Sequence, residues 1–317
     1  MAQHTNGSGL MIAALLALTL QASCPIELVV LGVGQDGGAP QLGRNDDPAW
    51  DDASLAMRAV SLGVVHHETG ERFLFEATPD MRAQLRDLDA VAGTTGPRAP
   101  DGIFLTHAHI GHYTGLIFLG HESMGAQGAR VYALERMAEF LRTNGPWSQL
   151  VEYGNIDLVT IPEEDAFGIA PRLMVQAFTV PHRQEFSEVA GYRIMGPQRS
   201  VLFIPDIDSW EEYDPEGGQI EQMIASVDRA YFDATFFDDG EIPGRDMSGF
   251  PHPFIRHSMA RFAHLPDEER AKIRFIHFNH TNPVRFPDSP ERAIVEAAGY
   301  GVAERGERFC LSGPSLR

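Results

Sequence analysis

Residues 105–116 read Leu-Thr-His-Ala-His-Ile-Gly-His-Tyr-Thr-Gly-Leu, and this stretch decides the fold. It begins at the end of the apolar run 103–105, which predicts a short buried strand. His107 and His109 are two residues apart and therefore project to the same side of an extended segment, whereas His112 follows where a turn can start a helix. Three imidazoles at the end of a strand can converge on one or two metal ions, and neutral imidazole is a preferred zinc ligand.

Strands and helices are predicted on both sides of this stretch. An apolar, β-branched strand at 26–33 ends in a Gly-rich loop, and residues 58–65 and 72–75 flank a polar turn as in a hairpin. Further strands are expected at 103–105, 131–133, 156–161, 173–180, 191–195, 201–204, 229–232 and 274–278, and helices at 79–88, 135–141, 254–265 and 290–298. Because strands come in pairs and runs with helices between the halves, an α/β (α+β) fold of two mixed sheets covered by helices fits better than a strictly alternating one.

Composition limits the classes of function. The 317 residues are 43% hydrophobic and 22% charged, which is typical of a chain with a packed core. Asp and Glu number 44 against 25 Lys and Arg, so the net charge is −19, and phosphate backbones and anionic membrane surfaces repel such a chain. We therefore expect no nucleic-acid partner and favour a protein that binds cations or a small-molecule substrate.

The sequence predicts a signal peptide at 1–23 and a single domain at 24–317. The apolar run 10–20 is too short to span a bilayer, and Gln-Ala-Ser-Cys follows it, ending at Cys24. Small residues before a Cys also predict a lipoprotein leader, in which a lipidated Cys24 tethers an exported, periplasmic protein to the membrane. The leader carries no Lys or Arg, and without a functional leader the protein would be cytoplasmic. Cys24 and Cys310 are too few for a Cys-rich zinc module or a disulfide framework.

The His-rich stretch resembles the His-x-His-x-Asp-His signature of the metallo-β-lactamase superfamily, whose four-layer αββα sandwich carries its site at the ends of two sheets. Later strings match further motifs of that superfamily, in order: Thr-Val-Pro-His at 179–182, Leu-Phe-Ile-Pro-Asp at 202–206 and Phe-Ile-His-Phe-Asn-His at 275–280. The resemblance implies metal ligation by His107, His109, His112, His182, Asp206 and His277, with Asp206 bridging two metals. It leaves His280 as a competitor of His277 and puts Glu76 in the place of an early structural Asp.

Other strings are similar to one branch of that superfamily, the pyrroloquinoline-quinone biosynthesis protein B branch. They are Gly-Gln-Asp-Gly-Gly-Ala-Pro-Gln at 34–41, Val-Pro-His-Arg-Gln-Glu-Phe-Ser-Glu at 180–188, Pro-Asp-Ile-Asp-Ser-Trp at 205–210 and Asn-His-Thr-Asn-Pro at 279–283. This resemblance covers nearly all of residues 24–317. It implies homology with the branch more firmly than it implies the same reaction, because one fold hosts many reactions.

Gly111 departs from the signature, since an Asp usually stands there, binds the second metal and helps to position the attacking water. The first site keeps three His ligands and an open fourth position, as a catalytic zinc requires. We therefore expect one firmly held zinc and a second metal that is weak or absent. Asp36, Asp208 or Asp233 could supply a substitute carboxylate, and the sequence does not choose among them.

The first functional hypothesis is an exported metal-dependent hydrolase, in which a zinc-bound hydroxide attacks a small-molecule ester, lactone, amide or phosphodiester. Asp206 would orient that hydroxide or take its proton, and His252 and His257, at the start of a predicted helix, are candidate proton donors. A second hypothesis is the biosynthetic or oxidative role that the branch implies, with iron or manganese in place of zinc. A third is a catalytically degenerate metal-binding protein. The net charge opposes a fourth, a nuclease.

Overall fold

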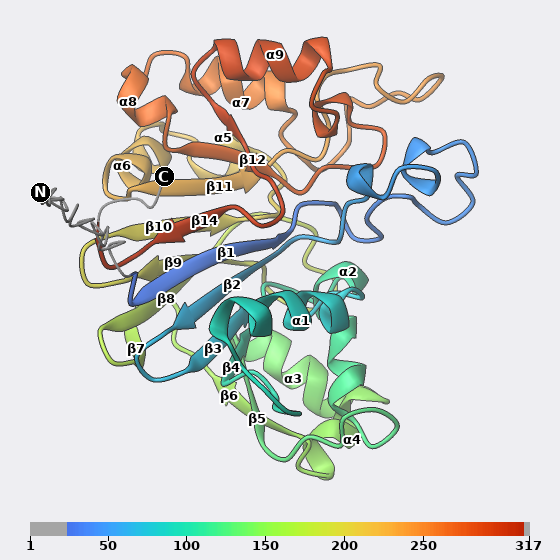
Figure 1. The fold of residues 1–317 in the computed structure, drawn as a ribbon. Helices are drawn as coiled ribbons and strands as arrows, with labels where there is room; N and C mark the ends of the chain where they lie inside the picture. The colour runs from blue at the N-terminus through green and yellow to red at the C-terminus, as the bar shows by residue number, and fades with distance from the viewer. Residues whose placement is uncertain (1–23, 314–317) are drawn as a thin grey trace, which may run out of the picture.

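The computed structural model describes residues 24–313 and builds them around two packed β-sheets (Figure 1). Each sheet has seven strands, in the orders β14-β1-β2-β3-β4-β5-β6 and β13-β12-β11-β10-β9-β8-β7. The first sheet contains β1 (Ile26–Gly32), β2 (Ser61–His66), β3 (Glu71–Phe75), β4 (Gly102–Phe104), β5 (Ala129–Ala133), β6 (Ile156–Thr160) and β14 (Arg308–Cys310). The second contains β7 (Phe167–Ala170), β8 (Leu173–Thr179), β9 (Ala190–Met195), β10 (Ser200–Ile204), β11 (Arg229–Asp233), β12 (Ile273–Ile276) and β13 (Gly301–Val302).

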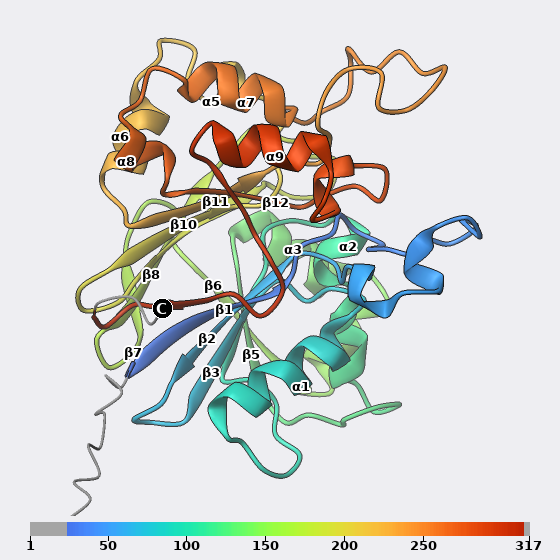
Figure 2. The ribbon, with the colours of Figure 1, turned by 45° about the horizontal axis from the view of Figure 1, so that its top comes forward.

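Helices cover the outer face of each sheet, which completes four layers (Figures 1 and 2). Beside the first sheet lie α1 (Met81–Ala92), α2 (Ile110–Tyr113), α3 (Glu135–Thr143) and α4 (Trp147–Glu152). Over the second lie α5 (Trp210–Tyr213), α6 (Gln219–Ala225), α7 (Ile255–Phe262), α8 (Asp267–Arg270) and α9 (Pro290–Ala297). Short 3-10 turns are η1 (Pro48–Trp50), η2 (Ala53–Leu55), η3 (Thr114–Leu119) and η4 (Pro283–Arg285). The predicted αββα sandwich is confirmed.

Aromatic side chains fill the space between the sheets. Phe104 of β4 stacks on Phe75 and Tyr132, with ring centroids 4.7 and 4.5 Å away, and Tyr192 of β9 meets it edge-on at 5.8 Å. Alternate residues of each strand face this layer, while the opposite face of the first sheet packs on α1 and α3. Burial of large apolar side chains on both faces makes the strand ends rigid supports for the loops that follow them.

The two cysteines form a disulfide that the sequence analysis did not anticipate. Cys24 lies just before β1, and Cys310 ends β14, which pairs antiparallel with β1, so the two thiols meet across adjacent strands. A sulfur in a disulfide cannot also carry a lipid thioether, so this disulfide and a membrane tether through lipidated Cys24 exclude each other, and the tether stays a prediction. Sequence patterns missed β14 because a three-residue strand carries no readable periodicity.

The predicted leader at 1–23 lies outside the described residues. Among residues 24–313, no helix combines the length and apolarity needed to cross a bilayer.

Candidate metal centre

The candidate ligands all come from the carboxyl ends of strands. In the first sheet β1, β3 and β4 point the same way, because β2 is antiparallel to β1 and β3 while β3 and β4 are parallel. In the second sheet β8, β10, β11 and β12 share a direction for the same reason. At or after these ends lie Asp36, Glu76, His107, His182, Asp206, Asp233 and His277. The Gln35 N–H donates to the Phe278 carbonyl at 2.8 Å, which joins the two sheets at this end.

The first cluster comprises His107, His109, His182 and Asp206, whose ligand atoms all lie within 4.8 Å of one another. Asp206 is at its centre, with Oδ2 3.5 Å from His107 Nε2 and Oδ1 3.2 Å from His182 Nε2. His109 directs its Nε2 to Glu185 at 3.2 Å, which leaves Nδ1 as its free ring nitrogen. Three imidazoles and one carboxylate converge here as the resemblance implied.

Two threonines orient imidazoles of the centre. The Thr106 hydroxyl donates to Glu76, so its lone pairs accept from His107 Nδ1 at 2.8 Å. In the same way the Thr235 hydroxyl donates to Asp233 at 2.7 Å and accepts from His277 Nδ1 at 2.9 Å. A protonated Nδ1 puts the lone pair on Nε2, the nitrogen that faces the cluster.

His182 and His112 are held by carboxylates instead. Asp208 Oδ1 lies 2.7 Å from His182 Nδ1, and Glu76 Oε1 lies 3.0 Å from His112 Nδ1. The inward Nε2 atoms of His107, His112, His182 and His277 are buried and have no hydrogen-bond partner. Buried ring nitrogens without a partner are costly in a protein interior, and divalent cations bound in the centre would satisfy them. The residues present therefore fit a zinc centre.

A second cluster adjoins the first and contains Asp36, His112 and His277, again with ligand atoms within 4.8 Å of one another. Asp36 Oδ1 is 3.3 Å from His112 Nε2, and Asp206 Oδ2 is 3.6 Å from the same nitrogen. Asp206 thus lies between the two clusters, in the bridging position that the resemblance implied.

His252 completes the centre from the loop before α7, and with Asp206, Asp233 and His277 it makes a further group whose possible ligand atoms lie within 4.8 Å of one another. Its Nδ1 lies 2.9 Å from Asp233 Oδ2 and 3.2 Å from Asp206 Oδ1. Asp233 in turn accepts from the Ile207 N–H at 3.1 Å, which anchors the chain immediately after Asp206. His252, Asp233 and Asp206 therefore form a buried chain of alternating charge beside the ligand cluster.

Comparisons with known proteins agree with this architecture. The model of the Beta-lactamase superfamily domain matches residues 71–278, which is more than half of the chain. The chain belongs to the metallo-β-lactamase superfamily. Coenzyme PQQ synthesis protein B of Gluconobacter oxydans is 28% identical over 323 residues, which is 91% of this chain and 100% of that protein. The protein of that name from Gluconacetobacter diazotrophicus is 26% identical over 90% of this chain and 99% of its own length.

Solved structures show the same metallo-β-lactamase fold. Zn(2+)-bound PqqB from Methylobacterium extorquens superimposes with a TM-score of 0.72 and 22% identity, over 89% of this chain and 99% of that one. A diphosphatase of the PhnP family superimposes with a TM-score of 0.62 and 20% identity, over 90% and 96%. The resemblance to the superfamily and to its PQQ synthesis protein B-like branch, stated from sequence motifs, is thereby confirmed.

Burial and neighbouring charges shift the pKa values of the ionisable groups in this metallo-β-lactamase centre. Burial and the neighbouring His112 lower the pKa of His107 well below its usual value. Burial alone would raise the pKa of Asp206, but His182 and His252 outweigh it and lower that pKa well below its usual value. Burial would likewise lower the pKa of His252, yet Asp233 and Asp206 raise it to about 10. These shifts favour an ionised Asp206, a neutral His107 and a protonated His252.

The structure separates the candidates that the sequence left open. His277 belongs to the second cluster, whereas His280 Nε2 lies 3.3 Å from the Arg44 guanidinium and outside both clusters. His252 is buried in the centre, but His257 is exposed on α7 and stacks on Phe254 at 4.9 Å. The prediction that His257 reaches the pocket is thus not supported, because the helix turns that side chain to the surface.

Sequence reasoning missed the groups that orient the ligands. Thr106, Thr235 and Asp208 each hold an imidazole through Nδ1. Two of them were visible as neighbours of ligand motifs, since Thr106 precedes His107 and Asp208 follows Asp206 by two residues. Polar residues beside a ligand are common without such a role, so only the measured contacts assign it.

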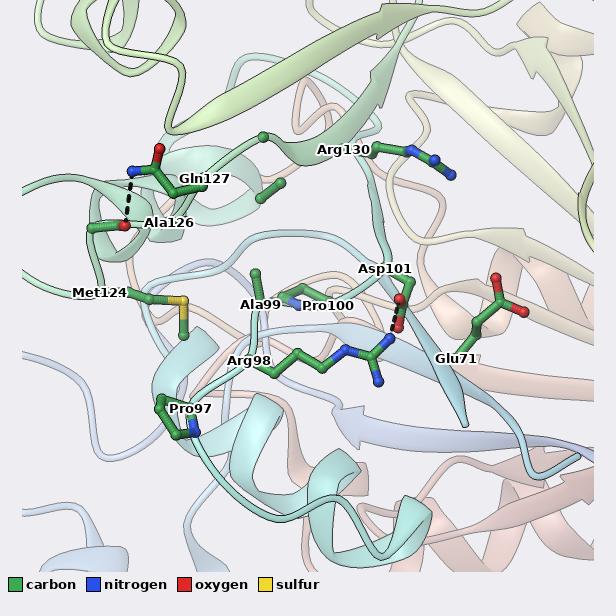
Figure 3. A pocket seen from close by; sticks show the side chains of 13 residues that line it. Glu71, Pro97, Arg98, Ala99, Pro100, Asp101, Met124, Ala126, Gln127 and Arg130 are labelled. Atoms are coloured by element: carbon green, nitrogen blue, oxygen red, sulfur yellow. Dashed lines mark hydrogen bonds and ion pairs between the residues drawn. The ribbon is translucent and has the colours of Figure 1, made fainter. Parts of the chain in front are cut away.

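A separate hollow lies between the segment 97–101 and the start of β5 (Figure 3). Its side chains include Arg98 and Asp101, which form an ion pair with each other, and none of its lining residues belongs to the clusters. The hollow therefore contributes nothing to the metal centre.

Proposed function

We propose that the protein is an exported, metal-dependent hydrolase that acts on a small-molecule ester, lactone, amide or phosphodiester. The observation that carries the proposal is the convergence of buried, unpartnered imidazole nitrogens on Asp206, next to the buried His252. The net charge of −19 favours a small-molecule substrate over a nucleic acid.

His107, His109, His182 and Asp206 would hold a zinc ion at the first cluster. Zinc in a site with an open position polarises the substrate oxygen and lowers the pKa of water from 15.7 toward about 7. Every other contribution comes from the chain itself. His107, His182 and Asp206 are buried, and hydrogen bonds to Nδ1 fix the two imidazoles, so the site is preorganised before the substrate binds.

Asp206 and His252 divide the proton chemistry. Asp206 is ionised and faces the ligand nitrogens, so it can orient a water molecule or accept its proton. Asp233 and Asp206 favour the protonated form of His252, whose Nδ1 lies 3.2 Å from Asp206 Oδ1, so His252 would be placed to donate to a leaving group that departs on that side. Asp233 stabilises the imidazolium and holds its orientation.

Export is proposed from two observations. Residues 10–20 form an apolar run like that of a signal peptide, and Cys24 and Cys310 form a disulfide. Disulfides persist in oxidising compartments and are rare in the cytosol. Fractionation of cells that express the full chain tests the proposal: a processed chain in the periplasm is expected, and an unprocessed chain in the cytoplasm contradicts it.

Hydrolysis is tested with the purified protein on a panel of ester, lactone, amide and phosphodiester substrates, with zinc, iron and manganese counted per chain. Turnover that disappears in His182→Ala but persists in the exposed-site control His257→Ala supports the proposal. Metal-loaded protein without turnover on any class of the panel contradicts it and leaves a metal-binding protein without hydrolase activity.

A second candidate is a biosynthetic or oxidative role like that of coenzyme PQQ synthesis protein B. Identity of 28% over 91% of this chain and the full length of the Gluconobacter oxydans protein supports it. Iron at one or more ions per chain, together with no hydrolysis of the panel, would favour this role over hydrolysis. Imidazole and carboxylate suit both zinc and iron, so the metal count decides between them.

A further inference from the structure

The space that a side chain at position 111 would occupy is filled by Asp36. Gly111 stands where the superfamily has its metal-binding Asp, so the chain lacks a carboxylate at that position. A Cβ atom added to Gly111 would lie 2.5 Å from Asp36 Cα and 2.9 Å from Asp36 Cβ, and closer still to Asp36 Oδ1. No real Cβ tolerates such contacts, so Gly111 and Asp36 form a complementary pair.

The Asp36 carboxylate also points toward His112 Nε2, the atom that a metal ligand at position 111 would have to accompany. Its Oδ1 lies 3.3 Å from His112 Nε2, is buried, and has no hydrogen-bond partner. His112 and His277 are both fully buried, and their Nε2 atoms are unpartnered as well. Three potential ligand atoms therefore converge from residues that are 75 or more positions apart in the chain.

The other two candidate carboxylates, Asp208 and Asp233, form their hydrogen bonds with other groups. Asp208 contacts Nδ1 of His182, the nitrogen that faces away from Asp206. Asp233 bonds to His252, Thr235 and the Ile207 N–H. Asp233 also lies 3.5 Å from His277, but from Nδ1 and not from Nε2, so of the three substitutes only Asp36 approaches an unpartnered Nε2 of the second cluster.

The loop of Asp36 is built to hold this position. Asp36 has a φ of 35°, an uncommon backbone conformation for a residue with a side chain. Its neighbour Gln35 bonds through its N–H to Phe278, next to His277, and through its side chain to Asn279. Such a conformation persists where the surroundings hold it, and it is concentrated at functional sites.

We propose that Asp36 replaces the carboxylate missing at Gly111, and that Asp36, His112, His277 and the bridging Asp206 form a second divalent-metal site. The centre then binds two ions with comparable firmness, in place of the one firm and one weak ion expected from the sequence. The inference rests on the metal centre of the proposed function and is independent of its reaction.

The test is a carboxylate exchange measured by metal content. The purified full chain and its variants are loaded with Zn²⁺ in the presence of a competing chelator, and bound zinc is counted by elemental analysis. Wild type is expected to hold two ions per chain, and both Asp36→Ala and the isosteric Asp36→Asn to hold one, with second-ion affinity lowered by more than about tenfold. The matched control is Asp51→Ala, an exposed Asp of the same long loop, which is expected to keep two.

The decisive variant is the double exchange Asp36→Gly with Gly111→Asp. It removes the side chain that blocks position 111 and returns a carboxylate there, so two ions per chain are expected again. Gly111→Asp alone is expected to bind less, because two side chains compete for one space. Substitution with Co²⁺ gives a second readout, since its visible spectrum changes when a carboxylate ligand is lost and recovers in the exchange.

The proposal is overturned if Asp36→Asn keeps two ions at wild-type affinity, or if the wild type binds only one ion at saturating zinc. It is also overturned if the double variant folds normally by circular dichroism and still does not bind the second ion. Hydrolysis is scored separately on the same samples. Two bound ions without turnover would contradict the hydrolase and support the second metal site. One bound ion with turnover would support the hydrolase and contradict the second metal site.

Discussion

Glu76 lies directly behind His112, with its Oε1 3.0 Å from His112 Nδ1 and both side chains fully buried. Glu76 follows β3 and has a φ of 84°, a conformation that turns the carboxylate toward the neighbouring strand end. It also accepts from the hydroxyl of Thr106, which supports His107. One carboxylate therefore orients one imidazole in each metal cluster, directly for His112 and through Thr106 for His107.

Replacement of Glu76 by Ala is expected to weaken zinc binding by about 10- to 100-fold, because both imidazoles lose the group that fixes their orientation. Glu76→Gln keeps an acceptor oxygen and should fall between Ala and wild type. Chelator competition measures the affinity, with the exposed Glu152→Ala on α4 as control. Unchanged zinc affinity in Glu76→Ala would show that the metal geometry does not depend on this contact.

Removal of a first-cluster ligand is expected to abolish tight zinc binding at that cluster. His107→Ala and His182→Ala each delete a buried Nε2 that faces Asp206. Each variant should lose one ion per chain in elemental analysis, while His257→Ala retains the wild-type content. If both ligand variants kept the full metal content, the assignment of the first cluster would be refuted.

His252→Gln is expected to lower turnover by about 10²- to 10⁴-fold, the usual contribution of a positioned proton donor, while zinc content stays the same. The reason is that Nδ1 of His252 is already paired with Asp233 and Asp206, and that His252 lies outside the first two clusters; a loss of zinc in His252→Gln would instead make it a ligand in its group with Asp206, Asp233 and His277. Asp233→Asn should lower turnover less, since it removes the partner of the imidazolium and not the proton donor. His257→Gln serves as control, and equal turnover in His252→Gln and wild type would exclude His252 as the donor.

Loss of the Cys24–Cys310 disulfide is expected to reduce the free energy of unfolding by about 2–4 kcal/mol, because the bond links residues 286 positions apart and restricts the unfolded chain. Urea unfolding of the Cys24→Ser/Cys310→Ser variant measures the loss. Reductant should lower the stability of wild type to that of the variant and leave the variant unchanged. If reductant also lowered the stability of the variant, the loss seen in wild type would not come from the disulfide alone.

The protein is expected to lose stability at alkaline pH through its buried phenols. Burial, followed by the nearby charges of Glu76 and Glu188, raises the pKa of Tyr192 well above its usual value. Because the unfolded phenol ionises near pH 10 and the folded one does not, the stabilisation is complete below about pH 10 and falls as the pH rises further.

Tyr192→Phe tests this origin. It should cost about 0.5–1.5 kcal/mol at pH 8, because the Leu105 carbonyl loses its donor, and should reduce the dependence of stability on pH above 10. Urea midpoints at pH 8 and 10.5 measure both effects, with the exposed Tyr153→Phe as control. An unaltered alkaline loss in Tyr192→Phe would assign the loss to other groups.

Much of the centre could be predicted from local sequence. His107, His182, Asp206 and His277 each follow a recognisable apolar strand, and strands that run in the same direction bring their carboxyl ends to one edge. Short elements such as β14 and α6 escaped prediction, because three or seven residues give no reliable periodicity. The choice of His277 over His280 came from the resemblance, and the structure places His277 beside Asp36 and His112 in the second cluster.

The order of strands and ligands along the chain follows from local sequence, since hydrophobic patterning and motif spacing are local properties of the chain. The pairing of residues that are distant in the chain is a result of tertiary packing: Asp36 meets Gly111, Cys24 meets Cys310, and His252 rather than His257 meets Asp206. Loops carry no periodic signal, and their positions follow from the packing of both sheets and from the volume left free. Gly111 has no side chain at the place that Asp36 occupies, and this relationship is visible only in the folded chain.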